Sequence, residues 1–189
     1  MEFLKLEKVH NGRYLKNYEL TYLNKAGKEK KFELVSRKEI TCKEELGLRP
    51  SGVSIVAYQG DRLLLLKEFR MSINKSIYNL CAGMLERGES LEDCIKRELY
   101  EETGLSVKQI ISILPPSFAA VGFSDTTTYA AFVEVEGEIE DHSSVNEDIR
   151  AGLYTKEEVK ELMEKEEFSS RSQIAAYFFV QGFKPVEEK

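Results

Sequence analysis

The sequence predicts a mixed α/β fold with a small antiparallel β unit at its N-terminus. The first observation is a series of β-rich runs, of which 53–58 and 63–69 are the clearest, with a turn-like stretch between them. The second is an amphipathic segment between Ser90 and Gly104 whose apolar residues recur at helical spacing. Two further helical segments follow towards the C-terminus. A mixed sheet packed between helices accommodates this order.

The N-terminal part divides from the rest at a Pro- and Gly-containing stretch near residue 50. We expect residues 1–48 to form a β-hairpin unit and residues 49–189 to form the main domain. Residues 14–23 alternate in polarity, and 31–35 resume a strand after a turn signal. A lone hairpin buries too little to be stable, so it should pack on the main domain, on a second subunit, or on both. A short helix is expected over 40–48.

The remaining elements are predicted from their residue composition and from the turn-forming and helix-capping residues that bound them. Strands are expected at 77–82, 107–114, 128–135 and 149–154, with a long connection over 115–127. Thr155 should cap an acidic helix, and Ser169 or Ser170 should begin the last one. This last helix is expected to bury Ile174, Tyr177 and Phe178, with Phe179 as a further candidate.

Composition narrows the class of protein. The chain has 189 residues and a net charge of −6, which argues against nonspecific binding to nucleic acid or to acidic membranes. No apolar run reaches membrane-spanning length, and residues 1–9 lack the apolar region of a signal peptide. The three cysteines, Cys42, Cys81 and Cys94, show no zinc spacing, so we expect reduced thiols and a cytoplasmic location.

The amphipathic helix carries an unusual concentration of acid. Ser90 and Gly104 are typical start and stop residues, and a stripe formed by Leu91, Cys94, Ile95 and Leu99 should be buried. The opposite face has three carboxylates, Glu98, Glu101 and Glu102. Arg97 can pair with Glu101 but cannot neutralise all three. The face is therefore either solvated or the site of a hard divalent cation such as Mg²⁺.

The spacing around this helix resembles the box of the Nudix hydrolases, G-x5-E-x7-R-E-U-x-E-E-x-G-U with U aliphatic. Its fixed positions are met by Gly83, Glu89, Arg97, Glu98, Leu99, Glu101, Glu102, Gly104 and Leu105. The resemblance implies an α/β/α sandwich and hydrolysis of a nucleoside diphosphate linked to another group. It also implies Mg²⁺, or Mn²⁺ in its place, bound chiefly by Glu98 and Glu102, with Glu101 as a further candidate.

Short segments outside the box are similar to those of ADP-ribose pyrophosphatases. Glu68-Phe69-Arg70 resembles a segment whose arginine binds substrate phosphate, which implies that role for Arg70. Cys81-Ala82-Gly83-Met84 resembles a segment in which the alanine carbonyl ligates metal, which implies Ala82 as a ligand. Met84 and Phe123, the latter within Gly122-Phe123-Ser124-Asp125, are implied as substrate contacts. The N-terminal hairpin resembles the dimerisation region of this branch, which implies a homodimer and a place for Arg37 near a substrate.

The sequence also departs from this branch. Val121 replaces a diagnostic proline, Thr126 a glutamate, and Asn79 the usual glutamate of the E-x-x-A-G run. Val145 occupies a position that carries a catalytic glutamate in some members, which leaves Glu147 as the nearest match. The general base is therefore assigned to Glu147 or to Glu101.

Three functions are compatible with these residues. The first is a metal-dependent hydrolase that cleaves the pyrophosphate bond of ADP-ribose or a nucleotide sugar. The second is a hydrolase of nucleoside triphosphates or dinucleotides, and the third a nucleotide-binding module without catalysis. All box carboxylates are present, which favours catalysis, and the N-terminal unit with the long 115–127 connection favours the first function over the second. The base and the sugar are not specified by the sequence.

Overall fold

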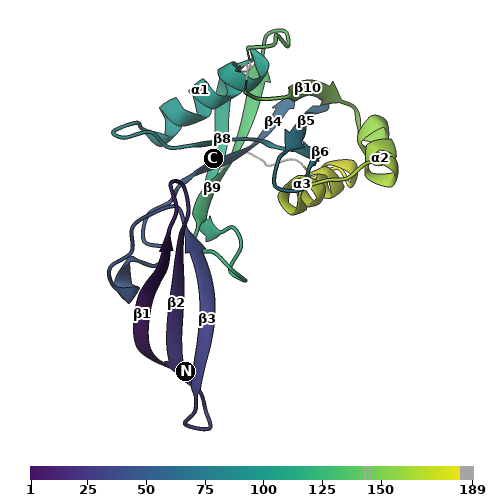
Figure 1. Cartoon of the computed structure of the whole chain (residues 1–189). Coiled ribbons are helices and arrows are strands. Elements are labelled where there is room, and N and C mark those ends of the chain that lie inside the picture. The colour runs from purple at the N-terminus through teal and green to yellow at the C-terminus, as the bar shows by residue number, and fades with distance from the viewer. Residues whose placement is uncertain (143, 145, 184–189) are drawn as a thin grey trace. The chain divides into compact units, whose positions relative to one another are not determined.

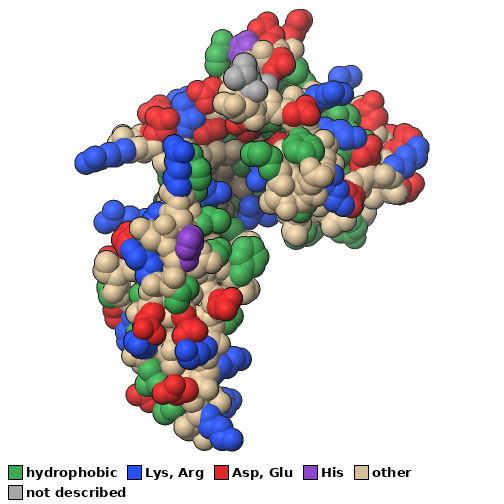
Figure 2. Space-filling view, viewed as in Figure 1, with side chains coloured by type: hydrophobic (Ala, Val, Ile, Leu, Met, Phe, Trp, Pro, Cys, Tyr) green, Lys and Arg blue, Asp and Glu red, His purple; other side chains and the backbone are tan. Residues whose placement is uncertain are grey.

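The computed structural model describes residues 1–142, 144 and 146–183, and these form two compact units (Figure 1). The first unit comprises Met1–Ser51 and Pro116–Thr128, and the second Gly52–Pro115 and the chain from Tyr129 onwards. In the view of Figure 2, Lys and Arg side chains are interspersed with Asp and Glu on the surface of each unit.

The first unit is built on a three-stranded antiparallel sheet with the order β1-β2-β3. Its strands are β1 (Glu2–Asn11), β2 (Lys16–Leu23) and β3 (Glu29–Ser36). The two predicted strands are present, and β1 adds a third that the sequence pattern did not predict. Tyr18, Leu20, Leu34 and Ile40 form a small core beneath the sheet. The Tyr18 hydroxyl accepts a hydrogen bond from the Ile40 amide at 2.8 Å, which fastens the segment after β3 to this core.

The short helix expected over 40–48 is wrong. Only one 3₁₀ turn forms there, at Lys43–Glu45. The Glu45 carboxylate turns back to accept hydrogen bonds from the Thr41 amide at 2.6 Å and the Thr41 hydroxyl at 3.0 Å. Gly47 then adopts a left-handed backbone with φ of 69°, which ends the turn before a second one can form.

The second unit contains most of a seven-stranded sheet, and the predicted mixed α/β fold is confirmed. The strand order of this sheet is β10-β5-β4-β9-β8, with β6 paired to β5 and β7 paired to β4. The strands are β4 (Gly52–Gln59), β5 (Arg62–Arg70), β6 (Lys75–Asn79), β7 (Cys81–Met84), β8 (Ser106–Phe118), β9 (Thr127–Glu136) and β10 (Ile149–Tyr154). The expected strand at 77–82 is two short strands on different partners, and β8 takes up the start of the expected 115–127 connection.

Helices cover both faces of this sheet. They are α1 (Leu91–Thr103), α2 (Lys156–Lys165) and α3 (Ser170–Val180). Because side chains alternate along a strand, Ile55 and Leu64 enter the core under α1, whereas Val56 and Leu65 enter the core under α2 and α3. Figure 1 shows α1 apart from the α2–α3 pair. Of the described helices, none is long and apolar enough to span a bilayer.

The predicted burial of α3 is correct on one side of the helix only. Phe179 is 1% exposed, but Ile174, Tyr177 and Phe178 are 58%, 53% and 48% exposed, contrary to expectation. A helix that is apolar around most of its circumference can turn only one stripe towards a sheet, and here that stripe contains Ala176 and Phe179. The other side of α3 remains open.

The ends of α1 are fixed as predicted. The Ser90 hydroxyl accepts a hydrogen bond from the Asp93 amide at 3.1 Å. Gly104 adopts φ of 73°, and its amide donates to the Tyr100 carbonyl at 2.8 Å. A Cβ at Gly104 would lie 2.9 Å from the Glu140 backbone nitrogen, so both the conformation and the space require glycine.

We therefore expect Gly104→Ala to destabilise the chain more than Gly60→Ala. Gly60 also has a left-handed backbone, at φ of 61°, but no atom lies within 4 Å of a Cβ built there. The Gly60 substitution should lower the free energy of unfolding by about 1 kcal/mol through backbone strain alone. Gly104→Ala adds a backbone clash and should cost at least about twice as much. Urea unfolding measures both, and equal losses would contradict this account of the helix end.

Candidate active site

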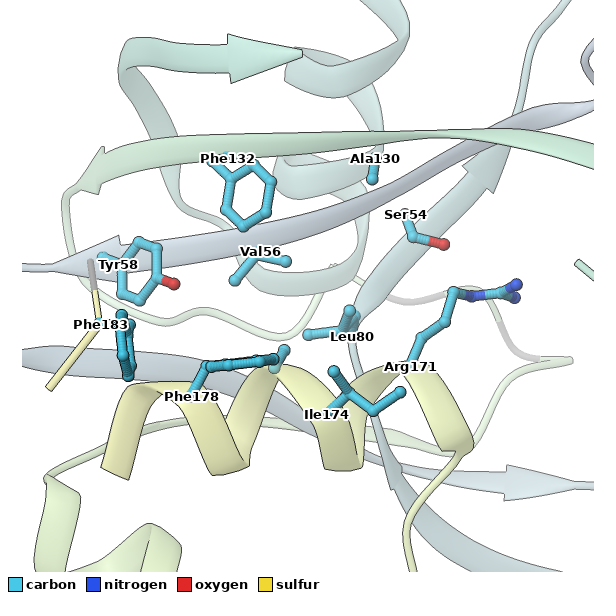
Figure 3. A pocket seen from close by; sticks show the side chains of 11 residues that line it. Ser54, Val56, Tyr58, Leu80, Ala130, Phe132, Arg171, Ile174, Phe178 and Phe183 are labelled. Atoms are coloured by element: carbon cyan, nitrogen blue, oxygen red, sulfur yellow. The ribbon is translucent and has the colours of Figure 1, made fainter. Parts of the chain in front are cut away.

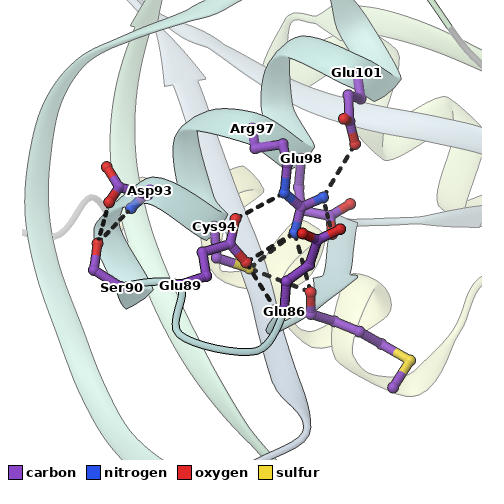
Figure 4. Close-up of polar contacts among 9 residues, drawn as sticks. Glu86, Glu89, Ser90, Asp93, Cys94, Arg97, Glu98 and Glu101 are labelled. Carbon is purple, nitrogen blue, oxygen red and sulfur yellow. Dashed lines mark hydrogen bonds and ion pairs between the residues drawn. The ribbon is translucent and has the colours of Figure 1, made fainter.

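The guanidinium group of Arg97 is the centre of a polar network at the start of α1 (Figure 4). Its Nε donates to Glu89 Oε1 at 2.7 Å and its Nη2 to Glu89 Oε2 at 3.0 Å. Its Nη1 donates to Glu98 at 2.8 Å and to Glu101 at 3.1 Å, which confirms the predicted pairing with Glu101. Nη2 also reaches the Met84 carbonyl at 3.1 Å. One side chain therefore joins the loop before α1 to two carboxylates on the helix.

Glu89 completes the attachment of this loop. The hydrogen bonds from Arg97 lower the pKa of Glu89 to about 2, so the carboxylate stays ionised. Its Oε2 also accepts a hydrogen bond from the Glu86 amide at 3.0 Å. Glu89 therefore joins two positions of the loop between β7 and α1 and also attaches this loop to the helix.

Glu98 lies against the backbone of β7. A Cβ built on Gly83 would lie 1.7 Å from the carboxyl carbon of Glu98, so only glycine allows this approach. Burial raises the pKa of Glu98, and the hydrogen bond from Arg97 opposes that shift. The fixed glycine of the box is thus explained by the space that the carboxylate occupies.

Glu102 lies beside the same strand, next to Ala82. Its Oε2 accepts a hydrogen bond from the Ala82 amide at 3.3 Å. Burial raises the pKa of Glu102 to about 8, the charge of Glu98 adds to the shift, and the Cys81 thiol and the Ala82 amide oppose it. The structure therefore brings Glu98 and Glu102 together at β7, one turn apart on α1. It does not bring Glu101 there, because Glu101 is exposed and bound to Arg97.

Arg70 and Glu147 line one pocket of about 270 Å³. The pocket forms where β10 pairs with β5, and the Phe69 amide donates to the Asp148 carbonyl at 2.9 Å. Arg70 is exposed and forms an ion pair with Glu68. The Glu147 carboxylate accepts a hydrogen bond from the Ser144 amide at 3.3 Å. Two side chains predicted separately as site residues, 77 positions apart, thus face the same space.

A hydrogen-bonded chain beside this pocket was not predicted. Asn79 Nδ2 donates to Glu68 Oε2 at 3.0 Å, and the Ser169 hydroxyl donates to Asn79 Oδ1 at 2.8 Å. The charge of Glu68 is also one of the causes that raise the pKa of Glu102. The sequence marked Asn79 only as a departure from related chains and Ser169 only as a candidate start of the last helix, and no local pattern pairs residues 90 positions apart.

The other predicted substrate contacts belong to different parts of the chain. Met84 is 54% exposed, and its carbonyl is held by Arg97. Arg37 and Phe123 belong to the first unit, whereas the carboxylates of α1 belong to the second. Arg37 is exposed and lines a small polar pocket with Asp125. Phe123 is 60% exposed, and its carbonyl accepts a hydrogen bond from the Val35 amide at 2.8 Å. Val145 lies outside the described residues.

Two of the three cysteines are buried, including Cys94 as predicted, and Cys42 is exposed. Cys81 and Cys94 are fully buried, and burial raises the pKa of the Cys94 thiol to about 12. The pKa of the Cys81 thiol is likewise raised by burial and by the charge of Glu102. Both thiols are therefore neutral packing groups beside the carboxylates, and neither is a nucleophile at neutral pH.

Comparison with curated proteins gives several relatives. The chain is 29% identical over 128 residues to the ADP-ribose pyrophosphatase of Bacillus subtilis, an alignment that covers 66% of this chain and 69% of the relative. It is 33% identical over 121 residues to the ADP-ribose pyrophosphatase of Saccharomyces cerevisiae, covering 62% of this chain and 51% of the relative. It is 28% identical over 137 residues to the ADP-sugar pyrophosphatase of Mus musculus, covering 70% and 60%. The chain thus spans about half of the yeast relative and more of the others.

Comparison with solved structures and family models agrees with these relatives. The crystal structure of an ADP compounds hydrolase has the same fold, with a TM-score of 0.72 at 19% identity, covering 95% of this chain and 91% of the other. The NUDIX domain model matches residues 42–177, which is well over half of the chain. The chain therefore belongs to the Nudix hydrolase family, and the relatives described above are named ADP-ribose or ADP-sugar pyrophosphatases.

Proposed function

We propose that this chain hydrolyses the pyrophosphate bond of ADP-ribose or a related nucleoside diphosphate sugar, with Mg²⁺ or Mn²⁺ as cofactor. The observation that carries the proposal is the pair of desolvated carboxylates, Glu98 and Glu102, held beside Ala82 and Gly83 at β7. The names of the relatives, ADP-ribose and ADP-sugar pyrophosphatases, support the class of substrate.

The donor set at β7 fits a hard divalent cation. Glu98 and Glu102 are both partly or largely buried, and the charge of Glu98 raises the cost of ionising Glu102. Among the described residues, there is no group of three or more Asp, Glu, His or Cys side chains placed to hold a metal ion by themselves. This matches the way Mg²⁺ is bound, with one or two carboxylates while substrate phosphates and waters fill its other positions. The Ala82 carbonyl would be the third protein ligand.

The residues around these carboxylates would then act on the diphosphate. A cation held by Glu98, Glu102 and Ala82 would supply positive charge where the pyrophosphate develops negative charge. Arg70, at the edge of its pocket, would bind a phosphate oxygen through its planar guanidinium. Water attacks one phosphorus and the bridging P–O bond breaks, so ADP-ribose would yield AMP and ribose 5-phosphate with release of a proton.

The general base is best assigned to Glu147. Glu101 is exposed and held by Arg97, which keeps its charge in place but limits its reach. Glu147 faces the pocket that contains Arg70, and its one described partner is the amide of a neighbouring loop residue. A carboxylate opposite a phosphate-binding arginine is placed to take a proton from the attacking water.

We further propose a homodimer formed through the first unit, as the resemblance implies. This unit leaves apolar side chains exposed, including Leu4 and Val9 on β1 and Tyr14 and Leu15 in the connection between β1 and β2. A closed pair with two-fold symmetry would cover such a surface. Light scattering should give twice the chain mass of 21.7 kDa at micromolar concentration, and a constant monomer mass would remove the proposal.

The substrate class is tested by a screen of nucleotides with Mg²⁺. ADP-ribose, ADP-sugars, nucleoside triphosphates and dinucleotides are compared by kcat/KM, with products identified by mass. We expect the nucleoside diphosphate sugars to be cleaved at the pyrophosphate bond and Glu102→Gln to lose most of the turnover, by a factor of at least about a hundred. A preference for triphosphates or dinucleotides would contradict the substrate class, and no turnover on any compound would contradict catalysis.

The same substitution should raise thermal stability at neutral pH in the absence of divalent metal. The pKa of Glu102 is about 8 in the folded chain and about 4.3 when unfolded. The stability of the folded state therefore falls as pH rises from about 4.3 to about 8, because the buried group resists ionisation. In EDTA, Glu102→Gln should melt close to the parent at pH 5 and at least about 3 °C above it at pH 8. Parallel melting curves for the two proteins would contradict the burial of this charge.

The assignment of the base is tested by comparing Glu147→Gln with Glu101→Gln at saturating Mg²⁺. We expect Glu147→Gln to lower kcat by about a hundredfold or more, since general-base assistance has that size. Glu138→Gln, on another exposed loop, is the matched control and should leave kcat unchanged. A Glu147→Gln enzyme within a factor of a few of the parent would leave Glu101 as the candidate.

A further inference from the structure

The second unit contains an apolar slot of about 460 Å³ between the sheet and α3 (Figure 3). Val56 and Tyr58 of β4 and Phe132 of β9 line one side, Ile174 and Phe178 of α3 line the other, and Phe183 stands at one end. This volume lies within the range of small-molecule sites in proteins, about 300–1,000 Å³. The slot is thus large enough for a ligand of the size of a substituted aromatic ring system.

The slot lies on the opposite face of the sheet from the carboxylates of α1. Along β4, Ile55 belongs to the core under α1, while its neighbour Val56 lines the slot. Along β9, Ala131 belongs to the α1 core and Phe132 lines the slot. Because successive strand residues point to opposite faces, the sheet itself separates the slot from Glu98 and Glu102.

The walls of the slot are preformed, and its α3 wall is open to solvent. Val56 and Tyr58 are 5% and 3% exposed and form the recessed floor, whereas Ile174 and Phe178 are about half exposed. Phe183 is held in place by an edge-to-face contact with Phe178, with ring centroids 5.6 Å apart, and its amide donates to the Phe178 carbonyl at 3.0 Å. Exposed apolar side chains that frame a recessed floor are a feature of ligand sites.

Arg171 gives the slot a charge at one end. It is the only formally charged side chain among the described residues that line the slot, and Figure 3 shows its guanidinium near Ser54, at the end remote from Phe183. Within the described part of the chain, Arg171 has no ion pair or hydrogen-bond partner. This differs from Arg70 and Arg97, both of which are paired with carboxylates. An unpaired cation at the end of an apolar slot is complementary to an anionic group on an apolar molecule.

We propose that this slot binds a small amphipathic anion, with its apolar or aromatic body between β4 and α3 and its anionic group on Arg171. The site is separate from the substrate site, and the proposal does not depend on which nucleotide the enzyme cleaves. Through Ser169, which begins α3 and donates to Asn79, the slot is also connected to Glu68 and Arg70.

The test uses two fluorescent probes on the full chain in EDTA: the anionic anilinonaphthalene sulfonate and the neutral N-phenylnaphthylamine. We expect Arg171→Gln to weaken binding of the anionic probe about tenfold, the size of one partly screened charge pair, and to leave the neutral probe unchanged. Arg62→Gln, at an exposed arginine of β5 outside the slot, is the matched control. Ala130→Phe fills the slot and should weaken both probes, with Ala175→Phe as a second filling variant if the first does not fold.

Several results would overturn the proposal. One is equal binding of the anionic probe to the Arg171 and Arg62 variants. Another is unchanged binding to a folded slot-filling variant. Competitive displacement of the probe by AMP would assign the slot to the substrate site instead. Probe binding could also fall as the chain self-associates and be restored by Phe178→Ala. That result would assign the slot to contact with a second copy of the chain.

Discussion

The site depends on one guanidinium group. Arg97 binds Glu89 through two hydrogen bonds, and it also binds Glu98, Glu101 and the Met84 carbonyl. The planar fork of an arginine can satisfy several acceptors at fixed angles, which a lysine cannot do. Without it, the loop before α1 would lose its attachment, and the like charges of Glu98 and Glu101 would face each other uncompensated. The attachment of this loop and the placement of Glu98 therefore both rest on Arg97.

The network divides the carboxylates of α1 and of the loop before it into groups with different roles. Glu89 and Glu101 are ion-paired to Arg97 and serve to hold it. Glu98 shares that pairing but also reaches β7, where Gly83 leaves room for its carboxylate. Glu102 is turned to the Ala82 amide and is largely desolvated. The desolvated pair is the arrangement that a cation would stabilise, and the paired residues are the arrangement that keeps it in place.

Local features of the site could be predicted from the sequence, because they obey rules of spacing along one helix. The start at Ser90, the stop at Gly104 and the Arg97–Glu101 pair are all of this kind. Contacts across long separations could not be predicted in this way. The shared pocket of Arg70 and Glu147 exists because β10 pairs with β5, and the Ser169–Asn79 contact exists because α3 packs near β6.

Burial was predicted less well than element type. Apolar periodicity placed Cys94, Ile95 and Leu99 correctly in the core, because α1 has a clear polar face to set against it. The last helix has no such face, so its sequence could not say which stripe meets the sheet, and Ile174 and Phe178 are exposed. The strand β1 was missed because its residues are nearly all exposed and show no sustained alternation. These failures share a cause, which is that a pattern specifies burial only when polar and apolar sides differ.

The most direct measurement of this account is a titration with Mn²⁺, followed by electron paramagnetic resonance, on the parent and on Arg97→Lys. The substitution keeps the positive charge but cannot bind Glu89, Glu98 and Met84 together. We predict that it weakens Mn²⁺ binding by about tenfold or more, as expected when the groups that orient metal ligands are lost. The neighbouring exposed Lys96→Gln should bind as the parent does. Parent-like affinity in Arg97→Lys would contradict the claim that this guanidinium organises the site.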